Sequence, residues 1–414
     1  MIFNLIKKKN NILKVGIASI LIIFAAGVSM WCTKTITKYI KEPEIKEGYW
    51  NHYLRLDYSP TNVITNGYAD ENTLYCASNV GILFFDEIGT IATNKPLQGS
   101  SHGFDRKILF FSDFVVYKSR VNQKWITISN YYRYQSNIAQ MTPSHFGTQF
   151  EEYYFYHTFG MDTFYDYGAM NNQNRFLTII TDNENTSLGV NTYIIYADID
   201  TNQQMGVEII NRGYIEIPSL LDAYITIYHI YAWDEKFYIA FYRESPWTGG
   251  IEDGFYYLAI TSDGSYREFF EPFENNYRIL SFFEYQGKLF AQTGHHFVLF
   301  YTEDGENWVN TNYWVRPENR TFKEIDGFIF GYMRDDVAII TDLLGTRKLY
   351  ELTKDNRAGA SVTSINKFKD DLVITTTNGI FYKPFDEVIN DLLNNTSEYD
   401  SHESVFEIQK NIKE

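Results

Sequence analysis

Two neighbouring carboxylates, Glu151 and Glu152, are the first residues whose types could do chemistry. A glycosidase places one carboxylic acid and one carboxylate about 5 to 10 Å apart, on either side of the bond that it cleaves. Adjacent side chains on a strand point to opposite faces, so this pair does not meet that requirement. We expect both groups to be solvated, and the sequence singles out no catalytic residue.

His295 and His296 could suggest a metal site, because imidazole is a common metal ligand. Neighbouring strand residues diverge, and no third ligand follows at a helical spacing. The sequence also has neither a Gly-x-Gly-x-x-Gly motif nor a phosphate-binding loop. We therefore predict no metal, no cofactor and a protein that is not an enzyme.

A tyrosine-rich segment from about residue 130 to residue 171 is the strongest candidate binding surface. Exposed tyrosines offer a large, rigid contact area with a polar tip, which suits recognition of a protein or a sugar. The alternative is that these rings pack between sheets, and the sequence leaves both open. The candidate residues are Tyr131, Tyr132, Tyr134, Tyr153, Tyr154, Tyr156, Tyr165 and Tyr167.

Composition indicates an acidic β protein. Aromatic residues make up 18% of the 414 residues, a level that favours half-buried strands over helices. The formal net charge is −16, although residues 1–46 are basic, so the rest of the chain repels nucleic-acid phosphates. Only Cys32 and Cys76 occur, and we expect Cys76 to be a buried structural thiol rather than part of a disulfide framework.

The N-terminal segment predicts a membrane helix. An uncharged apolar run covers residues 15–33, about 27 to 30 Å of helix, which is enough to cross a bilayer once. The lysines before it place the N-terminus in the cytoplasm and the rest of the chain outside. Cleavage as a signal peptide and lipidation at Cys32 are alternatives, but Trp31 stands where a lipoprotein signal has a small residue. We expect an uncleaved anchor in residues 1–33 and a stalk over residues 34–48.

Beyond the stalk, polar turns followed by aromatic or aliphatic strands recur at intervals of roughly 35 to 65 residues, the range of a four-stranded propeller blade. These units predict an all-β protein, a seven-bladed β-propeller over residues 49–386. The seven turns are residues 70–72, 105–107, 172–174, 234–236, 286–288, 326–327 and 370–371.

The two ends of this region resemble each other. Residues 74–85 and residues 372–383 both read as a strand, an Asn-containing turn, Gly-Ile and an aromatic strand. The last unit lacks a fourth strand, and residues 49–57 could supply it and so remove exposed sheet edges. Two stacked β-sandwiches are the alternative architecture. Residues 387–414 are predicted to form a short helix and a polar, acidic tail.

One turn carries a family-like motif. Thr302, Asp304, Gly305 and Trp308 follow an aromatic strand, and this pattern resembles the Asp-box, or BNR repeat, of the sialidase-like propellers. Thr and Asp hydrogen-bond the turn backbone, Gly supplies a positive φ, and Trp packs between blades. Residues 261–266 look like a degenerate copy with Tyr in place of Trp. The resemblance implies a structural motif without chemistry of its own.

The resemblance also implies what an active sialidase would need, which is an Arg cluster, a Tyr with a Glu partner, and an acidic Asp. Such propellers have an arginine-containing element near their start, which this sequence lacks. Residues 277–280 are the most similar stretch, but they lie in the wrong part of the chain. We therefore expect a noncatalytic member, a membrane-anchored extracytoplasmic scaffold that binds a protein partner. The alternative is a glycan-binding or glycan-hydrolysing protein.

Overall fold

Short aromatic and β-branched stretches between polar turns form the strands of this protein, as their fit to a half-buried pleated surface predicts. The computed structural model describes residues 51–55, 64–78, 81–85, 93–95, 109–111, 114–118, 126–130, 138–156, 168–183, 190–200, 207–245, 252–273, 278–294, 298–314, 321–333, 336–340, 343, 349–352, 361–377 and 379–395.

Within these residues the strands form seven antiparallel sheets, six with four strands and one with five. The first three sheets in chain order contain β2 (Ile64–Ala69), β3 (Leu74–Ser78), β4 (Gly81–Phe85) and β5 (Thr93–Lys95); β6 (Leu109–Phe110), β7 (Phe114–Lys118), β8 (Ile126–Asn130) and β9 (Ile138–Met141); and β10 (Tyr154–Phe155), β11 (Gly168–Met170), β12 (Arg175–Thr181), β13 (Thr192–Asp200) and β14 (Glu208–Ile215).

The next three sheets contain β15 (Tyr224–Trp233), β16 (Lys236–Glu244), β17 (Gly254–Ile260) and β18 (Tyr266–Phe270); β19 (Ile279–Tyr285), β20 (Lys288–Thr293), β21 (Val298–Thr302) and β22 (Val309–Trp314); and β23 (Thr321–Ile325), β24 (Phe328–Met333), β25 (Asp336–Ile340) and β26 (Leu349–Leu352). The last sheet joins β27 (Val362–Phe368), β28 (Asp371–Thr376) and β29 (Gly379–Pro384) to β1 (Asn51–Arg55).

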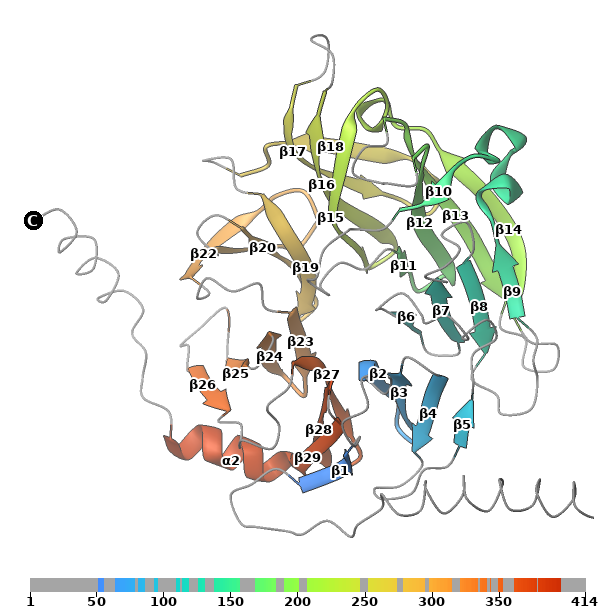
Figure 1. The fold of residues 1–414 in the computed structure, drawn as a ribbon. Coiled ribbons are helices and arrows are strands. Elements are labelled where there is room, and N and C mark those ends of the chain that lie inside the picture. Colours follow the sequence, from blue (N-terminus) through green and yellow to red (C-terminus); the bar gives the residue numbers. More distant parts are fainter. Residues whose placement is uncertain are drawn as a thin grey trace, which may run out of the picture.

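The sheets are arranged around a common centre. Apart from β10 and β11, which both pair with β12, consecutive strands of a sheet are neighbours in it. The first strands β15, β19, β23 and β27 each contact the first strand of the next sheet. Figure 1 shows these strands turned inward and the later strands turned outward. This all-β arrangement is a β-propeller. The alternative of two stacked sandwiches is wrong.

The last sheet closes the ring with a strand from the start of the fold. β1 pairs antiparallel with β29, and Asn51 lies opposite Tyr382. The predicted pairing of residues 49–57 with the last unit is therefore confirmed. β27 also contacts β2, so the last sheet packs side to side on the first.

Tight turns between the first and second strands fix the register of most sheets. Asn174, Asp234, Gln286, Asp326 and Lys369 all have positive φ values between 51° and 60°. Two-residue hairpin turns need this left-handed backbone, and Asn, Asp and Gly adopt it at least cost. These turns coincide with five of the seven predicted turns.

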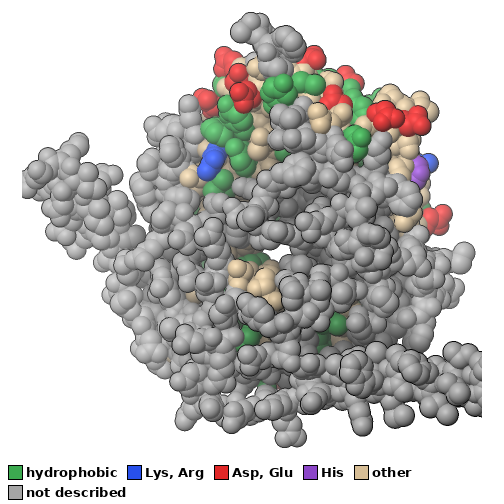
Figure 2. All heavy atoms as spheres, in the orientation of Figure 1, with side chains coloured by type: hydrophobic (Ala, Val, Ile, Leu, Met, Phe, Trp, Pro, Cys, Tyr) green, Lys and Arg blue, Asp and Glu red, His purple; other side chains and the backbone are tan. Residues whose placement is uncertain are grey.

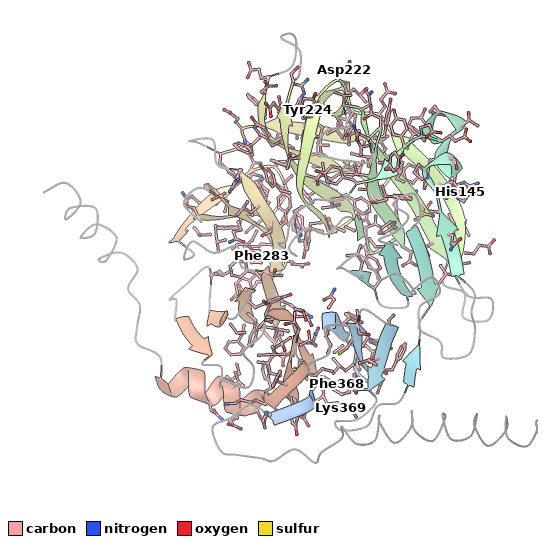
Figure 3. The ribbon with its side chains drawn as sticks, in the orientation of Figure 1. His145, Asp222, Tyr224, Phe283, Phe368 and Lys369 are labelled. Atoms are coloured by element: carbon pink, nitrogen blue, oxygen red, sulfur yellow. The ribbon has the colours of Figure 1, made fainter. Side chains whose placement is uncertain are left out.

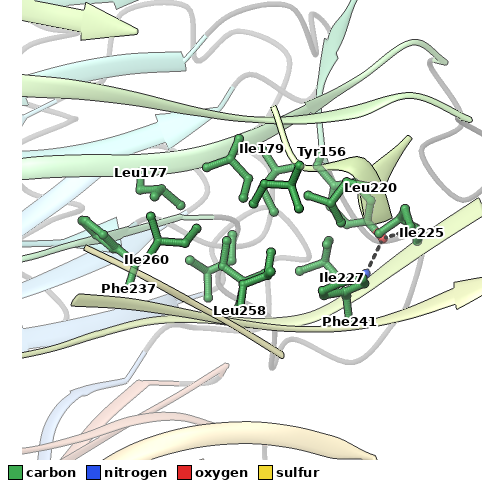
Figure 4. Close-up of a cluster of buried hydrophobic side chains, with 14 of the residues drawn as sticks. Tyr156, Leu177, Ile179, Leu220, Ile225, Ile227, Phe237, Phe241, Leu258 and Ile260 are labelled. Carbon is green, nitrogen blue, oxygen red and sulfur yellow. Dashed lines mark hydrogen bonds between the residues drawn. The ribbon is translucent and has the colours of Figure 1, made fainter. Parts of the chain in front are cut away.

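The core lies between adjacent sheets. One cluster joins the sheet of β12 to the sheet of β15 through Leu177, Ile179, Ile227 and Leu258, all at most 2% exposed (Figure 4). Aliphatic side chains from both sheets interdigitate there, and burial of this apolar surface holds the sheets together. Each sheet thus depends on its neighbours for its core.

A single amphipathic helix, α2 (Phe385–Asn395), follows the last strand and packs on β28 and β29. The predicted short helix is therefore present. The predicted membrane segment, residues 15–33, lies outside the described residues, as do the stalk and the residues after 395. Among the helices that the structure describes, none is long and apolar enough to cross a membrane.

Candidate functional site

The structure describes three of the eight candidate tyrosines. Tyr131, Tyr132, Tyr134, Tyr165 and Tyr167 lie outside the described residues. Tyr153 and Tyr154 are half-buried, and Tyr156 is buried.

Tyr156 does not belong to a binding surface. Its ring is 4% exposed, and its hydroxyl accepts a hydrogen bond from the Ile227 amide at 2.9 Å and donates one to the Ile225 carbonyl at 3.3 Å. A bulge in β15 after Ile227 frees backbone groups that this hydroxyl can bind. For Tyr156 the alternative of packing between sheets is correct, because the inter-sheet contact removes both its ring and its polar tip from solvent.

Tyr153 belongs to an aromatic patch on the outer side of the third sheet, which comprises Phe150, Tyr153, Tyr193 and Tyr214. The ring centroid of Phe150 lies 5.2 Å from that of Tyr153, 4.9 Å from that of Tyr193 and 5.1 Å from that of Tyr214. All three contacts are edge-to-face, an arrangement that aromatic quadrupoles favour. Phe150 is 1% exposed and Tyr214 is 43% exposed, so a buried ring supports tyrosines that reach solvent.

Two short 3-10 helices and two outer strands build the aromatic patch. η2 (Pro143–Phe146) and η3 (Thr148–Phe150) follow β9, and their apolar anchors Phe146 and Phe150 are both buried. Tyr193 lies on β13, and Tyr214 lies on β14 opposite Ile195. Since side chains two residues apart share a face of a strand, Tyr193, Ile195 and Tyr214 all face the 3-10 helices.

The electrostatics of the aromatic patch keep Tyr153 and Tyr193 neutral. Burial, followed by the negative surroundings of Tyr193 and Asp182, raises the pKa of Tyr153 to about 12. Burial and then Glu216 raise the pKa of Tyr193. These two phenol groups therefore stay protonated at neutral pH and can donate hydrogen bonds.

Arg212 and a neutral histidine, His145, lie beside the aromatic patch. Burial and the nearby Arg212 lower the pKa of His145, which lies at the outer rim of the molecule (Figure 3). Figure 2 shows that carboxylates predominate over the rest of the upper rim. The aromatic patch thus combines one exposed and two half-buried tyrosines with one neighbouring guanidinium on an otherwise acidic surface.

The other sequence candidates do not form a site in the described region. Glu151 and Glu152 follow η3 and are both exposed, as expected. His295 and His296 lie outside the described residues. No group of three potential metal ligands occurs among the residues that were placed.

The turn that resembles an Asp-box joins β21 to β22 and is closed by side chains. Asp304 Oδ1 accepts hydrogen bonds from the backbone amides of Glu306 at 2.9 Å and Asn307 at 2.8 Å. It also accepts one from the Thr302 hydroxyl at 2.8 Å, and that hydroxyl in turn accepts one from the Gly305 amide at 2.9 Å. These hydrogen bonds hold the pKa of Asp304 well below its usual range.

Gly305 and Trp308 fit the same turn to the neighbouring sheet. Gly305 has a φ of +80°, and a methyl group there would collide with the Tyr238 hydroxyl. The Trp308 Nε1 donates to the Tyr257 hydroxyl at 3.0 Å, and its ring contacts Phe273 at 5.6 Å. The turn therefore fastens one sheet to the next and presents no reactive group.

The degenerate copy occupies the equivalent turn between β17 and β18. Asp263 accepts hydrogen bonds from the Thr261 hydroxyl and the Ser265 amide, and these lower its pKa to about 2. Asn171 donates to the Ser262 hydroxyl at 3.1 Å, so this turn too is tied to a neighbouring sheet. Both turns join the third strand of a sheet to the fourth.

No protein-family model and no curated protein match this chain. Among solved structures, virginiamycin B lyase from Staphylococcus aureus is 10% identical, covering 80% of this chain and 97% of its own, with a TM-score of 0.48. The AfRom2 CNH domain is 8% identical over 80% of this chain and 97% of its own, with a TM-score of 0.46. The extracellular domain of a hybrid two component system of B. thetaiotaomicron is 15% identical, covering 80% of this chain and 40% of its own, with a TM-score of 0.47. Similarities this weak carry no functional residue over to this chain.

Sequence reasoning missed three members of the aromatic patch. Phe150 and Tyr193 occur in stretches that read as ordinary core, and Tyr214 follows a glycine in an outer strand. The only signal was the density of tyrosines around residue 153. The contact among η3, β13 and β14 depends on the tertiary fold, so no spacing in the sequence reveals it.

Proposed function

We propose that this protein is a noncatalytic, sialidase-like propeller of seven blades, held outside the membrane by residues 15–33, that binds a protein partner. The seven antiparallel sheets support the blade count. The two side-chain-closed turns, each between the third and fourth strand of its sheet, support the sialidase-like assignment. The apolar run and its preceding lysines support the anchor and its orientation.

The aromatic patch is the observation that carries the binding role. Tyr214 exposes 43% of its surface next to the half-buried Tyr153 and Tyr193, while Phe150 holds all three rings in place. Tyrosine anchors that are already rigid lose little conformational entropy on binding, which is why they are frequent in protein interfaces.

The placement of the described arginines supports a noncatalytic role. Arg175 pairs with Asp198 in the third sheet, whereas Arg243 donates to the Ser219 carbonyl in the fourth. The guanidinium of Arg278 lies 5.9 Å from the ring centroid of Tyr228. Each guanidinium thus has a structural contact of its own, whereas a sialidase-like site would gather several around one substrate carboxylate.

Site-specific photocrosslinking tests the binding role. A benzophenone amino acid at position 214 should crosslink one protein partner in intact cells. The same probe at Tyr266, which is 38% exposed on the outer strand β18, is the matched control and should not crosslink that protein. Equal crosslinking from both positions, or from neither, contradicts the proposed surface.

Exposed tyrosine rings also suit sugars, so a glycan is the second candidate ligand. A glycan array and a panel of fluorogenic glycosides, each run with the intact protein and a Tyr214→Ala variant, separate the two candidates. Binding that Tyr214→Ala abolishes supports a lectin-like role. Hydrolysis of any glycoside overturns the noncatalytic assignment.

Cell fractionation tests the anchor. The full chain should sediment with membranes and be digested by protease added to intact cells, whereas a variant that lacks residues 1–33 should be released. A Cys32→Ser variant should remain in the membrane fraction, because the proposed anchor is the helix and not a lipid. Release of Cys32→Ser would favour lipidation instead.

A further inference from the structure

Lys323 is an unusual cation at the inner edge of the propeller. It lies on β23, the first and innermost strand of its sheet, and its side chain is half-buried. Its Nζ donates a hydrogen bond at 2.6 Å to Oδ1 of Asn366, which lies on β27, the innermost strand of the next sheet. Asn366 is 1% exposed, so the contact is made at the inner junction between two sheets.

The same position in the preceding sheet holds an aromatic residue. Lys323 lies opposite Phe330 in its hairpin, two residues before the strand ends. The equivalent residue in the preceding sheet, Phe283, lies opposite Phe290 and packs on Phe322 at a centroid distance of 4.7 Å (Figure 3). Lys323 thus places a charge where the preceding sheet has an aromatic ring, and Asn366 holds the same position in the next sheet.

That charge has no counter-ion among the described residues. The neighbouring carboxylate, Glu324, accepts a hydrogen bond from the Gln286 amide instead, and no carboxylate of the described chain lies within ion-pair distance of Lys323. Burial alone lowers the pKa of Lys323 to about 8. A half-buried ammonium group without an opposite charge loses part of its hydration, and this loss lowers the stability of the fold.

The Asn366 amide is held in the orientation that faces the ammonium. Its Nδ2 donates to the Ser364 hydroxyl at 3.1 Å, and that hydroxyl lies 2.6 Å from the Thr375 hydroxyl. An ammonium group only donates hydrogen bonds, so the amide oxygen must face Lys323. One of the three ammonium donors is used in this way, which leaves two for a ligand.

We propose that Lys323, held by Asn366, binds a small oxyanion, a carboxylate or a phosphate, at the inner edge of the propeller. An oxyanion accepts hydrogen bonds from both free ammonium donors and neutralises the charge. This site is separate from the aromatic patch and does not depend on a protein partner.

Thermal unfolding of the whole protein tests the proposal with two probes, sodium phosphate and sodium citrate, at constant ionic strength against sodium chloride. At least one probe should raise the midpoint of wild-type unfolding by about 2 °C or more. The response should disappear in Lys323→Met, which keeps the length of the side chain and removes its charge. The larger response identifies phosphate or carboxylate as the preferred group.

Two further variants keep the test decisive. Lys367→Met removes an exposed lysine that pairs with Asp326, and it should keep the wild-type response. Asn366→Asp supplies a built-in carboxylate beside Lys323, and it should fold, unfold at a higher temperature and lose the response. A wild-type midpoint that neither probe moves, or a response that Lys323→Met or Asn366→Asp retains, overturns the proposal.

Discussion

At the scale of single residues, two polar side chains show how hydrogen bonds organise the backbone. Asp304 accepts hydrogen bonds from the free amide groups of a turn, and the buried hydroxyl of Tyr156 accepts one from a backbone amide of the next sheet. Lys323 differs from both, because its ammonium group donates to the Asn366 side chain and not to the backbone. Three predictions belong to this scale.

Asp304→Ala should lower the free energy of unfolding by about 2 kcal/mol, because it leaves the Glu306 and Asn307 amides without their acceptor. Urea unfolding measures the change. Glu303→Ala is the control, since its exposed carboxylate makes only a surface pair with Lys288, and it should cost less than about 1 kcal/mol. Equal losses in the two variants would show that the turn does not depend on Asp304.

Gly305→Ala should destabilise the protein by more than Gly287→Ala. Both glycines have positive φ, +80° and +71°, so an added methyl group strains the backbone by about 1 kcal/mol at either position. A methyl group at residue 305 also meets the Tyr238 hydroxyl, whereas at residue 287 it meets nothing within 4 Å. The difference between the two losses measures that contact, and a difference near zero contradicts it.

Lys323 should make stability depend on pH. Its pKa is about 8 in the folded protein and about 10.4 in an unfolded chain, so the unfolded state binds more protons between these values. The wild type should therefore gain stability relative to Lys323→Met as the pH rises from 7 to 10. Urea unfolding of both proteins across this range gives the difference, and a constant difference contradicts the shift.

At the scale of elements, the strands are joined into sheets by short turns, and the sheets are joined by side chains that cross between them. Five predicted turns coincide with left-handed turn residues, since Asn, Asp and Gly mark this backbone in the sequence. The predicted turn at residues 105–107 lies outside the described residues. The apolar run after it contains the innermost strand β6, and β7 follows from residue 114. Hydrophobic runs alone do not say which strand of a sheet they form.

Tyr156→Phe should weaken the junction between the third and fourth sheets by about 1 to 3 kcal/mol, because the buried Ile227 amide loses its acceptor. Tyr266→Phe on an exposed outer strand removes a hydroxyl from a surface tyrosine and should change the unfolding free energy little. Chemical unfolding of the two variants compares them. A Tyr156→Phe protein as stable as the wild type would show that water or another group replaces the hydroxyl.

At the scale of the whole molecule, each sheet leaves its two faces to be covered by neighbours, so the ring is stable only when it is closed. β1 provides the fourth strand of the last sheet, although more than 300 residues of sequence, about the whole fold, separate it from β29. The acidic surface adds repulsion that this packing must overcome.

Removal of residues 1–56 should therefore lower the thermal midpoint well below that of a protein that lacks only residues 1–48. The shorter deletion keeps β1 and its pairing with β29, whereas the longer one leaves an exposed edge on β29 and an incomplete sheet. Thermal unfolding and light scattering follow the loss of stability and the expected aggregation. Equal midpoints would mean that closure by β1 adds nothing.

The sequence by itself determined the β class, the repeated hairpins, the closing strand and the short C-terminal helix, because these follow from local alternation, turn residues and composition. It also singled out the 302–308 turn, whose hydrogen bonds join residues close together in the chain. Only the tertiary structure decided that Tyr156 is buried, that Phe150 supports Tyr193 and Tyr214, and that Lys323 faces Asn366. These contacts join residues from separate strands or separate sheets, and neither periodicity nor spacing encodes which faces meet when the ring closes.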